Sequence, residues 1–175
     1  MAHKEQRDFF KRLQGDYPGM FVDVSVLEIG SLNINGTIRD FFDARKYVGV
    51  DVAPGAGVDV VAEGQELTYP NGSFDVTVSA ECFEHNPYWL ETFENMVRMS
   101  RRWVVFTCAS EGRPEHGTTR TTPQDSPLTL DWDYYRNLTE DDFRSVFDFD
   151  VFEFYRFEYN PVSCDLYFVG CLPVQ

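Results

Sequence analysis

The chain has 175 residues, the usual length of one domain and enough to bury a hydrophobic core. Its N-terminus is polar, unlike a signal peptide, and no apolar run reaches the ~18 residues of a membrane span, so we expect a soluble, cytoplasmic protein. The net charge of −14 argues against a nucleic acid as partner, because such binding requires Lys and Arg to neutralise phosphates.

The four cysteines, at positions 82, 108, 164 and 171, show no C-x-x-C pairing, and the chain has three histidines. The sequence therefore predicts neither a disulfide framework nor a metal site. Cys82, Cys108 and Cys171 lie in apolar surroundings and are interpreted as core thiols.

The N-terminal residues 4–15 predict a short amphipathic helix, with Phe9, Phe10 and Leu13 on its apolar side and Gly15 at its end. A turn follows at residues 17–19, and the chain then enters its first predicted strand.

Residues 24–36 (VSVLEIGSLNING) predict that strand and the loop after it. The apolar run contains the acidic Glu28 and gives way to a loop bounded by Gly30 and Gly36, where glycine brings the main chain close to a ligand. Apolar side chains then recur at helical spacing, which predicts a helix over residues 37–44. An ordinary tight turn between strand and helix is the alternative interpretation of this loop.

A second strand, residues 46–51 (KYVGVD), ends on Asp51, which lies 21 positions after Gly30. A carboxylate about 20 residues past a glycine loop lies at the tip of the adjacent strand, where it can accept hydrogen bonds from ribose hydroxyls. A solvated Asp at a strand end is the alternative, but the two features together favour a nucleotide-binding α/β sheet.

Three more strands are predicted at residues 58–61, 74–80 and 103–108, and a helix at residues 87–101. We expect Leu90, Phe93, Met96 and Val97 on the buried face of that helix. Ligands of open α/β sheets bind at the carboxyl ends of strands, where strand order reverses. His85, just after the strand at 74–80, is therefore the candidate general base. Alternatively, His85 caps the following helix or supports the loop.

Residues 110–136, which we call the lid segment, show neither helical nor strand periodicity. A loop of this length in a compact domain is usually functional or disordered. The segment leaves the carboxyl end of the strand at 103–108, so we expect it to fold over the crevice and select the substrate. Its candidate substrate-binding residues, together with one residue before it, are Tyr88, His116, Arg120, Tyr134 and Tyr135.

The C-terminal part predicts a helix opened by Thr139 as N-cap, with Phe143, Val146 and Phe147 facing inward. Two strands follow at about residues 150–159 and 165–172 and form a closely connected pair.

The run V-L-E-I-G-x(5)-G, followed by Y-V-G-V-D, resembles motifs I and II of class I S-adenosylmethionine-dependent methyltransferases, particularly the methyltransferase type 11 group. The stretch from Asp59 to His85 is similar to that family's third and fourth motifs. The resemblance covers roughly residues 17–110 well. The S-L-N-I-N-G run departs from the family's closely spaced glycines, and Glu63 stands where the family usually has Asp.

The resemblance implies a single α/β domain with a Rossmann-like, doubly wound sheet of seven mostly parallel strands, an antiparallel closing hairpin and helices on both faces. It implies S-adenosylmethionine as cofactor, S-adenosylhomocysteine as product and a small-molecule methyl acceptor. In that family the 30–36 loop cradles the methionine part, Asp51 binds ribose and Glu63-Gly64 meet adenine. Glu28 anchors the amino group through water or orients the loop. The implied cofactor-binding residues are Glu28, Gly30, Ser31, Gly36, Asp51, Val52, Glu63, Gly64, Ser79 and Ala80, the last two at the methyl end.

Two other functional classes stay open at this point. A dinucleotide-dependent oxidoreductase would share the fold, but the loop lacks the middle glycine of G-x-G-x-x-G and no second domain carries substrate chemistry. A non-catalytic binding module on a methyltransferase fold would also fit the altered loop.

Overall fold

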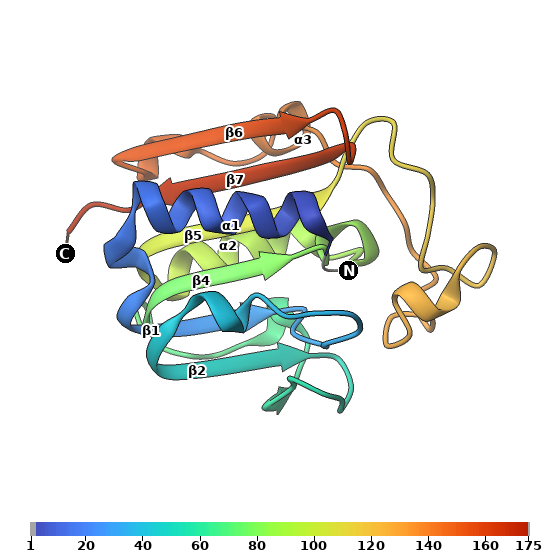
Figure 1. Cartoon of the computed structure of the whole chain (residues 1–175), viewed down its shortest axis with the longest axis horizontal. Helices are drawn as coiled ribbons and strands as arrows, with labels where there is room; N and C mark the ends of the chain where they lie inside the picture. The colour runs from blue at the N-terminus through green and yellow to red at the C-terminus, as the bar shows by residue number, and fades with distance from the viewer. Residues whose placement is uncertain (1–2, 175) are drawn as a thin grey trace.

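The computed structural model describes residues 3–174 and is built on a seven-stranded sheet (Figure 1). The strand order is β3-β2-β1-β4-β5-β7-β6, in which β7 runs antiparallel between β5 and β6 and the other pairs are parallel. The predicted fold class is confirmed. The strands are β1 (Val22–Ile29), β2 (Asp43–Asp51), β3 (Val60–Val61), β4 (Phe74–Ala80), β5 (Ser100–Ala109), β6 (Phe154–Asn160) and β7 (Asp165–Cys171).

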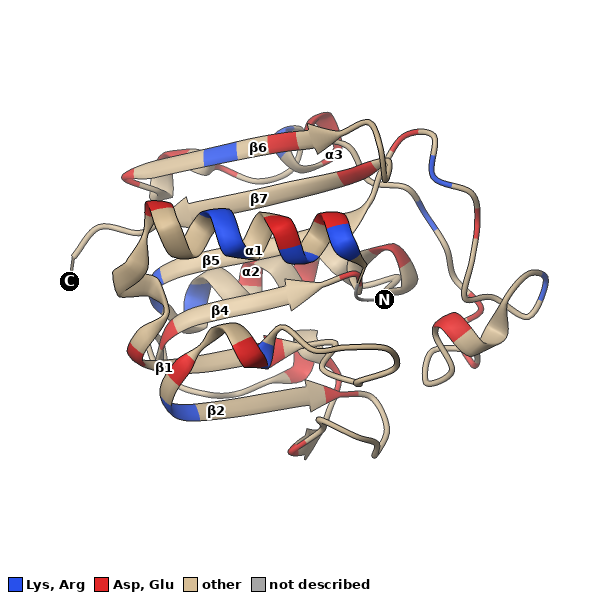
Figure 2. Cartoon of the chain, viewed as in Figure 1, with Lys and Arg blue, Asp and Glu red and all other residues tan. Residues whose placement is uncertain are grey.

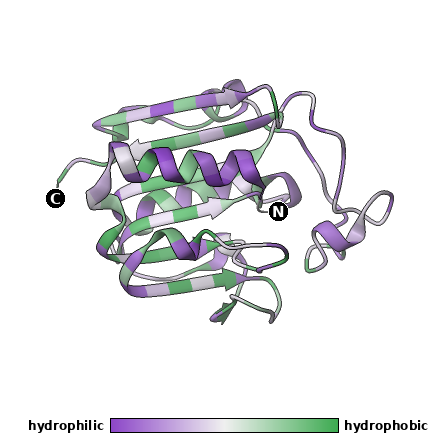
Figure 3. Cartoon of the chain, viewed as in Figure 1, coloured by the Kyte–Doolittle hydropathy of each residue, from purple (hydrophilic) through white to green (hydrophobic). Residues whose placement is uncertain are grey.

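Helices cover both faces of the sheet because the apolar side chains of its inner strands alternate between two cores. Helix α1 (Lys4–Asp16) packs Phe9, Phe10 and Leu13 on one face, against Val26 and Val105. Helices α2 (Trp89–Met99) and α3 (Glu140–Arg144) pack on the other face. Figure 3 shows the apolar residues concentrated in the strands, whereas α1 turns a hydrophilic side outward.

The helix predicted over residues 37–44 is wrong. The structure has only a 3-10 turn there, Arg39–Phe41, and β2 begins at Asp43. Helix α1 already occupies this face of the sheet, where the Phe10 and Phe41 rings stack 5.7 Å apart. The Asp43 amide donates to Phe21 O at 2.8 Å, which draws the chain directly into the sheet.

Other boundaries differ by a few residues. Strand β3 is only two residues long, and a 3-10 turn, Phe149–Val151, replaces the start of the predicted strand at 150–159. Val146 was expected inside but is 51% exposed, because α3 ends at Arg144 and leaves Val146 beyond its buried face. On α2, Leu90 and Val97 are only partly buried, and Trp89 and Met99 contribute to the core instead.

Two local predictions are confirmed in detail. Thr139 is the N-cap of α3 and forms a capping box with Asp142, whose carboxylate accepts from both the Thr139 amide and hydroxyl. The four cysteines are free, and Cys108 and Cys171 are buried as predicted, whereas Cys82 is only partly buried because it lies in the wall of a cavity.

Residues of both charge signs occur along α1 and on β6 (Figure 2). Within residues 3–174, no helix combines the length and the apolar character that crossing a membrane requires.

Candidate functional site

The site is a cavity at the carboxyl ends of β1 and β4, the point where strand order reverses. The space between its walls is about 660 Å³, counting the part that opens to solvent. Three segments form its walls: the loop after β1, the turn after β4 and residues 125–129 of the lid segment.

The loop after β1 is held against the end of β2. The amides of Gly30 and Ser31 both donate to Val50 O, at 2.9 and 3.1 Å. Gly30 has a φ of 81°, and a Cβ there would lie 2.6 Å from Cys82 Cβ, so only glycine fits. The loop therefore runs close to the turn after β4, and its main chain forms one wall of the cavity.

Asp51, at the end of β2, lines the cavity and positions the loop. Its Oδ2 accepts from the Leu32 amide at 3.0 Å and its Oδ1 from the Val52 amide at 2.8 Å. Burial raises the pKa of Asp51 above its usual value, although both hydrogen bonds oppose that shift. Each oxygen keeps a lone pair for a ligand hydroxyl.

Glu28 also lines the cavity, and it is the most deeply buried of the predicted cofactor-binding carboxylates. The hydroxyl of Tyr47 donates to Glu28 Oε2 at 2.9 Å. Burial raises the pKa of Glu28 to about 7, despite that hydrogen bond. At neutral pH the site can therefore hold Glu28 protonated or ionised, and a cationic ligand group would favour the ionised form.

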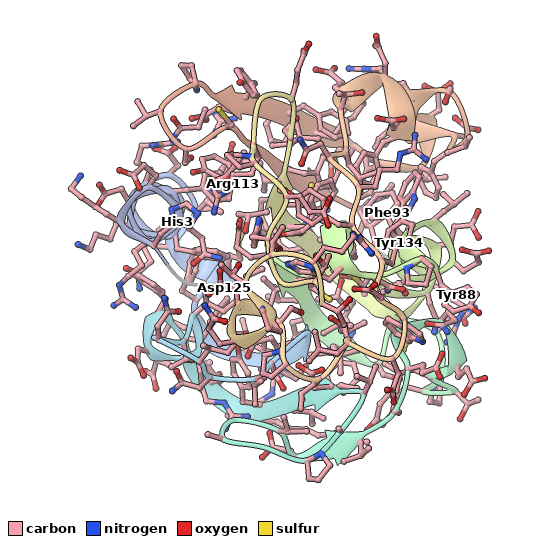
Figure 4. All side chains as sticks on the ribbon, turned by 90° about the vertical axis from the view of Figure 1, so that its right-hand side faces the viewer. His3, Tyr88, Phe93, Arg113, Asp125 and Tyr134 are labelled. Carbon is pink, nitrogen blue, oxygen red and sulfur yellow. The ribbon has the colours of Figure 1, made fainter. Side chains whose placement is uncertain are left out.

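The lid segment crosses the mouth of this crevice. Figure 4, which faces the carboxyl ends of the parallel strands, shows Asp125 in front of them. The 3-10 turn Pro123–Asp125 is fixed by the Thr122 hydroxyl, which donates to Asp125 Oδ2 at 2.6 Å. Asp133 ties the two arms of the segment together, since it accepts from the Thr119 amide and hydroxyl, each at 2.8 Å.

His85 lies on the floor of the cavity, in the 3-10 turn Phe83–His85, and is 3% exposed. Its ring centroid lies 5.0 Å from that of His116 and 5.6 Å from that of Tyr135, so the lid segment packs on it. Burial lowers the pKa of His85 to about 3, with His116 adding to the shift. The imidazole is therefore neutral at pH 7.

Two buried glutamates flank His85. Burial raises the pKa of Glu84 to about 8, and the charge of Glu81 adds to that rise. Glu81 differs because His3 lies 3.6 Å from its Oε2. Although burial opposes it, the contact with His3 lowers the pKa of Glu81 to about 2.

The structure brings together most of the predicted site residues. Those that line the cavity are Glu28, Gly30, Ser31, Gly36, Asp51, Ala80 and His85. His116 and Tyr135 lie behind His85 in the aromatic cluster rather than in the lining.

Seven further predicted residues lie outside the lining, and the structure gives a reason for three of them. Gly64 is a packing residue, because a Cβ there would lie 2.7 Å from Thr92 Cγ2 on α2. Ser79 is buried and donates to Ile29 O. Arg120 pairs with Glu115 and Asp133 within the lid segment. The other four are Val52, Glu63, Tyr88 and Tyr134, of which Tyr88 lies at the periphery in Figure 4.

Several lining residues were not predicted. Gln6 comes from α1, where its Nε2 donates to Thr107 Oγ1 at 3.2 Å, and residues 125–129 come from the lid segment. Gln6 carries no sequence signal, because long-range packing alone places it. The lid segment was expected to cover the crevice, but the sequence did not indicate which of its residues would do so. Glu81 directly follows an apolar strand, and residues at that position of an α/β sheet border the ligand site, so the sequence could have predicted it.

Comparison with known proteins gives two findings. A family model described as a methyltransferase domain, Methyltransf_11, matches residues 28–106. No protein of curated function matches the sequence.

Solved structures share the fold at low identity. A putative methyltransferase from Bacillus halodurans has a TM-score of 0.60 and 11% identity, over 95% of this chain and 99% of its own. Magnesium protoporphyrin IX methyltransferase from Synechocystis, with bound S-adenosylhomocysteine, has a TM-score of 0.61 and 9% identity, over 97% and 82%. A phosphoethanolamine N-methyltransferase from Haemonchus contortus has a TM-score of 0.63 and 13% identity, over 96% of this chain and 53% of its own.

Proposed function

The chain carries a class I, type 11-like methyltransferase domain, and we propose that it transfers the methyl group of S-adenosylmethionine to a small-molecule acceptor. The observation that carries this proposal is one cavity at the switch point that gathers the glycine loop, Asp51, Glu28 and His85. The family match over residues 28–106 spans the same motifs.

The residues present fit the cofactor. The buried Ser31 Oγ lines the cavity and has no hydrogen-bond partner among residues 3–174, so a ligand group would satisfy it. Asp51 would hold the ribose hydroxyls with its remaining lone pairs. Glu28 would bind the amino group, directly or through water, because an ammonium beside it stabilises the ionised carboxylate.

Glu63 and Gly64, the proposed adenine-binding residues, lie outside the cavity lining. Gly64 O accepts from Asn95 Nδ2 at 2.8 Å, which anchors the 3-10 turn Gly64–Glu66 on α2. This turn follows β3, beside the end of β2 that carries Asp51. Glu63 is not among the lining residues, so contact with adenine would require its side chain to move toward the cavity.

S-adenosylmethionine supplies an electrophilic methyl group on a sulfonium, which is already an activated leaving group. This chain then has to align the acceptor with that methyl group and keep water out, which are effects of proximity and desolvation. Ala80 and His85 border the space where the acceptor would lie, and residues 125–129 cover it. The neutral His85 ring can accept a hydrogen bond from the acceptor, which orients the nucleophilic atom.

A small acceptor suits this arrangement better than a polymer. The lid segment covers the cavity, and the net charge of −14 disfavours polyanions. We therefore propose that the protein is a cytoplasmic methyltransferase of class EC 2.1.1.

The test is calorimetric titration of the purified chain with S-adenosylhomocysteine and, in parallel, with NAD. Micromolar binding of S-adenosylhomocysteine alone supports the proposal. Binding of NAD alone would instead identify an oxidoreductase. Binding of neither would favour a non-catalytic module, and turnover of S-adenosylmethionine with any acceptor would exclude that module.

A further inference from the structure

Three buried side chains beside the cavity form a cluster of metal-ligand type. Glu84 and His85 come from the turn after β4, and His116 comes from the lid segment. One nitrogen or oxygen from each lies within 4.8 Å of those of the others. Glu84 is 0% exposed, His85 3% and His116 9%. The sequence did not indicate this cluster, because 31 positions separate His85 from His116.

Most polar atoms of this cluster lack hydrogen-bond partners, although on His85 the buried nitrogen without a partner, Nδ1, is not the one that lies near Glu84. Both carboxylate oxygens of Glu84, His85 Nδ1 and His116 Nε2 are buried and lack a partner among residues 3–174. His116 Nδ1 lies 3.1 Å from Pro114 O, so it must carry the proton, and Nε2 must carry a lone pair. That lone pair lies 4.0 Å from Glu84 Oε1.

The distances suit a shared ion better than a hydrogen bond. His85 Nε2 also lies 4.0 Å from Glu84 Oε1, beyond hydrogen-bond reach. Ligand atoms that bind one ion at about 2.1 Å lie roughly 3 to 4 Å apart. A cation between the three side chains would therefore be bound through Glu84 Oε1, His85 Nε2 and His116 Nε2.

Glu84 differs from the buried acids Glu81 and Asp165 in the basic side chains around it. Asp165 has His3 at 2.9 Å and Arg113 at 3.0 Å, and Glu81 shares His3. Glu84 has no Lys or Arg within ion-pair distance among the described residues. A buried carboxylate without a partner must either stay protonated or bind a cation.

We propose that Glu84, His85 and His116 bind a divalent first-row metal ion beside the methyl-transfer cavity. Two imidazoles and a carboxylate suit Mn²⁺, Fe²⁺ or Zn²⁺, whereas Mg²⁺ prefers oxygen ligands alone. The three ligands leave coordination positions for water or substrate.

The ion would have a direct use at this place, and this use rests on the proposed function. His85 lines the cavity, so an acceptor hydroxyl could bind the ion through its oxygen and lose its proton to solvent. The oxygen would then form the bond to the methyl carbon as the carbon–sulfur bond breaks, with that electron pair remaining on sulfur. His85 would hold the ion rather than take the proton.

The test is calorimetric titration of the EDTA-stripped full-length chain with Mn²⁺, Zn²⁺ and Mg²⁺. We expect one Mn²⁺ or Zn²⁺ per chain, and Mg²⁺ at least tenfold weaker. Glu84→Gln and His116→Gln should each weaken Mn²⁺ binding at least tenfold. Glu111→Gln, at an exposed carboxylate of the same segment, should change it less than twofold.

Absence of one-to-one Mn²⁺ and Zn²⁺ binding by the wild-type chain would overturn the proposal. Equal Mn²⁺ affinity of wild type and Glu84→Gln would also overturn it. If His3→Gln abolished binding while His116→Gln did not, the ion would belong to His3, Glu81 and Asp165, and the assignment would be wrong. The same samples are also titrated with S-adenosylhomocysteine. Loss of S-adenosylhomocysteine binding with intact metal binding would contradict the proposed function and leave the metal site standing.

Discussion

Replacing Glu28 with Gln should make the folded protein more stable at neutral and alkaline pH. Glu28 is 4% exposed, and burial raises its pKa from 4.5 to about 7. At about 1.36 kcal/mol per pKa unit, the ionised carboxylate destabilises the folded state by about 3 kcal/mol relative to the unfolded chain. Gln keeps the shape and can still accept from the Tyr47 hydroxyl.

The direction of the pH dependence follows from the raised pKa. Between pH 4.5 and about pH 7 the folded state holds the Glu28 proton more tightly than the unfolded state does. Wild-type stability relative to Glu28→Gln is therefore highest below pH 4.5, falls through this window and is constant above it.

The assay is urea unfolding of both proteins, followed by circular dichroism at several pH values from 4.5 to 8. Taking the difference between the two proteins cancels the titration of all other groups. Glu111→Gln, at an exposed carboxylate, is the matched control and should show a small difference. A wild-type curve that runs parallel to the Glu28→Gln curve across this range would refute the reasoning.

Three further predictions concern the cavity. Asp51→Ala should weaken S-adenosylhomocysteine binding well over tenfold by calorimetry, because charge-assisted bonds to ribose are lost; unchanged affinity would contradict the ribose assignment. His85→Ala should leave that affinity within about threefold but slow methyl transfer at least tenfold, measured with an acceptor found by screening; unaffected turnover would make His85 structural. Gly30→Ala should lower the free energy of unfolding by ~1 to 3 kcal/mol, because its Cβ would overlap Cys82 at a positive φ. Gly19→Ala, with open space around it, is the control, and equal losses at both positions would contradict this account.

Much of the fold could be predicted because its signals are local. Strand β4 begins and ends at the predicted residues, and α1 buries Phe9, Phe10 and Leu13 as its spacing indicates. Thr139 caps α3 through atoms three residues apart. Such features depend on neighbours in the sequence, so a pattern of residue types suffices to predict them.

The helix over 37–44 shows where local signals fail. The spacing of Ile38, Phe41 and Phe42 suits a helix, yet all three pack against parts of the chain that are distant in sequence. Phe41 stacks on Phe10 of α1, and Phe42 stacks on Phe21, with ring centroids 4.8 Å apart. These apolar residues are therefore buried from a 3-10 turn rather than a helix, because α1 covers that face of the sheet.

For the site, the sequence was sufficient to identify residues at the carboxyl ends of strands or just after them. The glycine loop, Glu28, Asp51 and His85 were identified because parallel strands bring their carboxyl ends to one edge. The groups that complete the site are brought there by packing between distant segments. Gln6 of α1, which lies 79 residues before His85, was not predicted. The lid segment was expected over the crevice and His116 was a candidate, but the packing places residues 125–129 in the lining and His116 against His85. No local pattern encodes such contacts, since they arise only when the sheet, α1 and the lid segment are packed together.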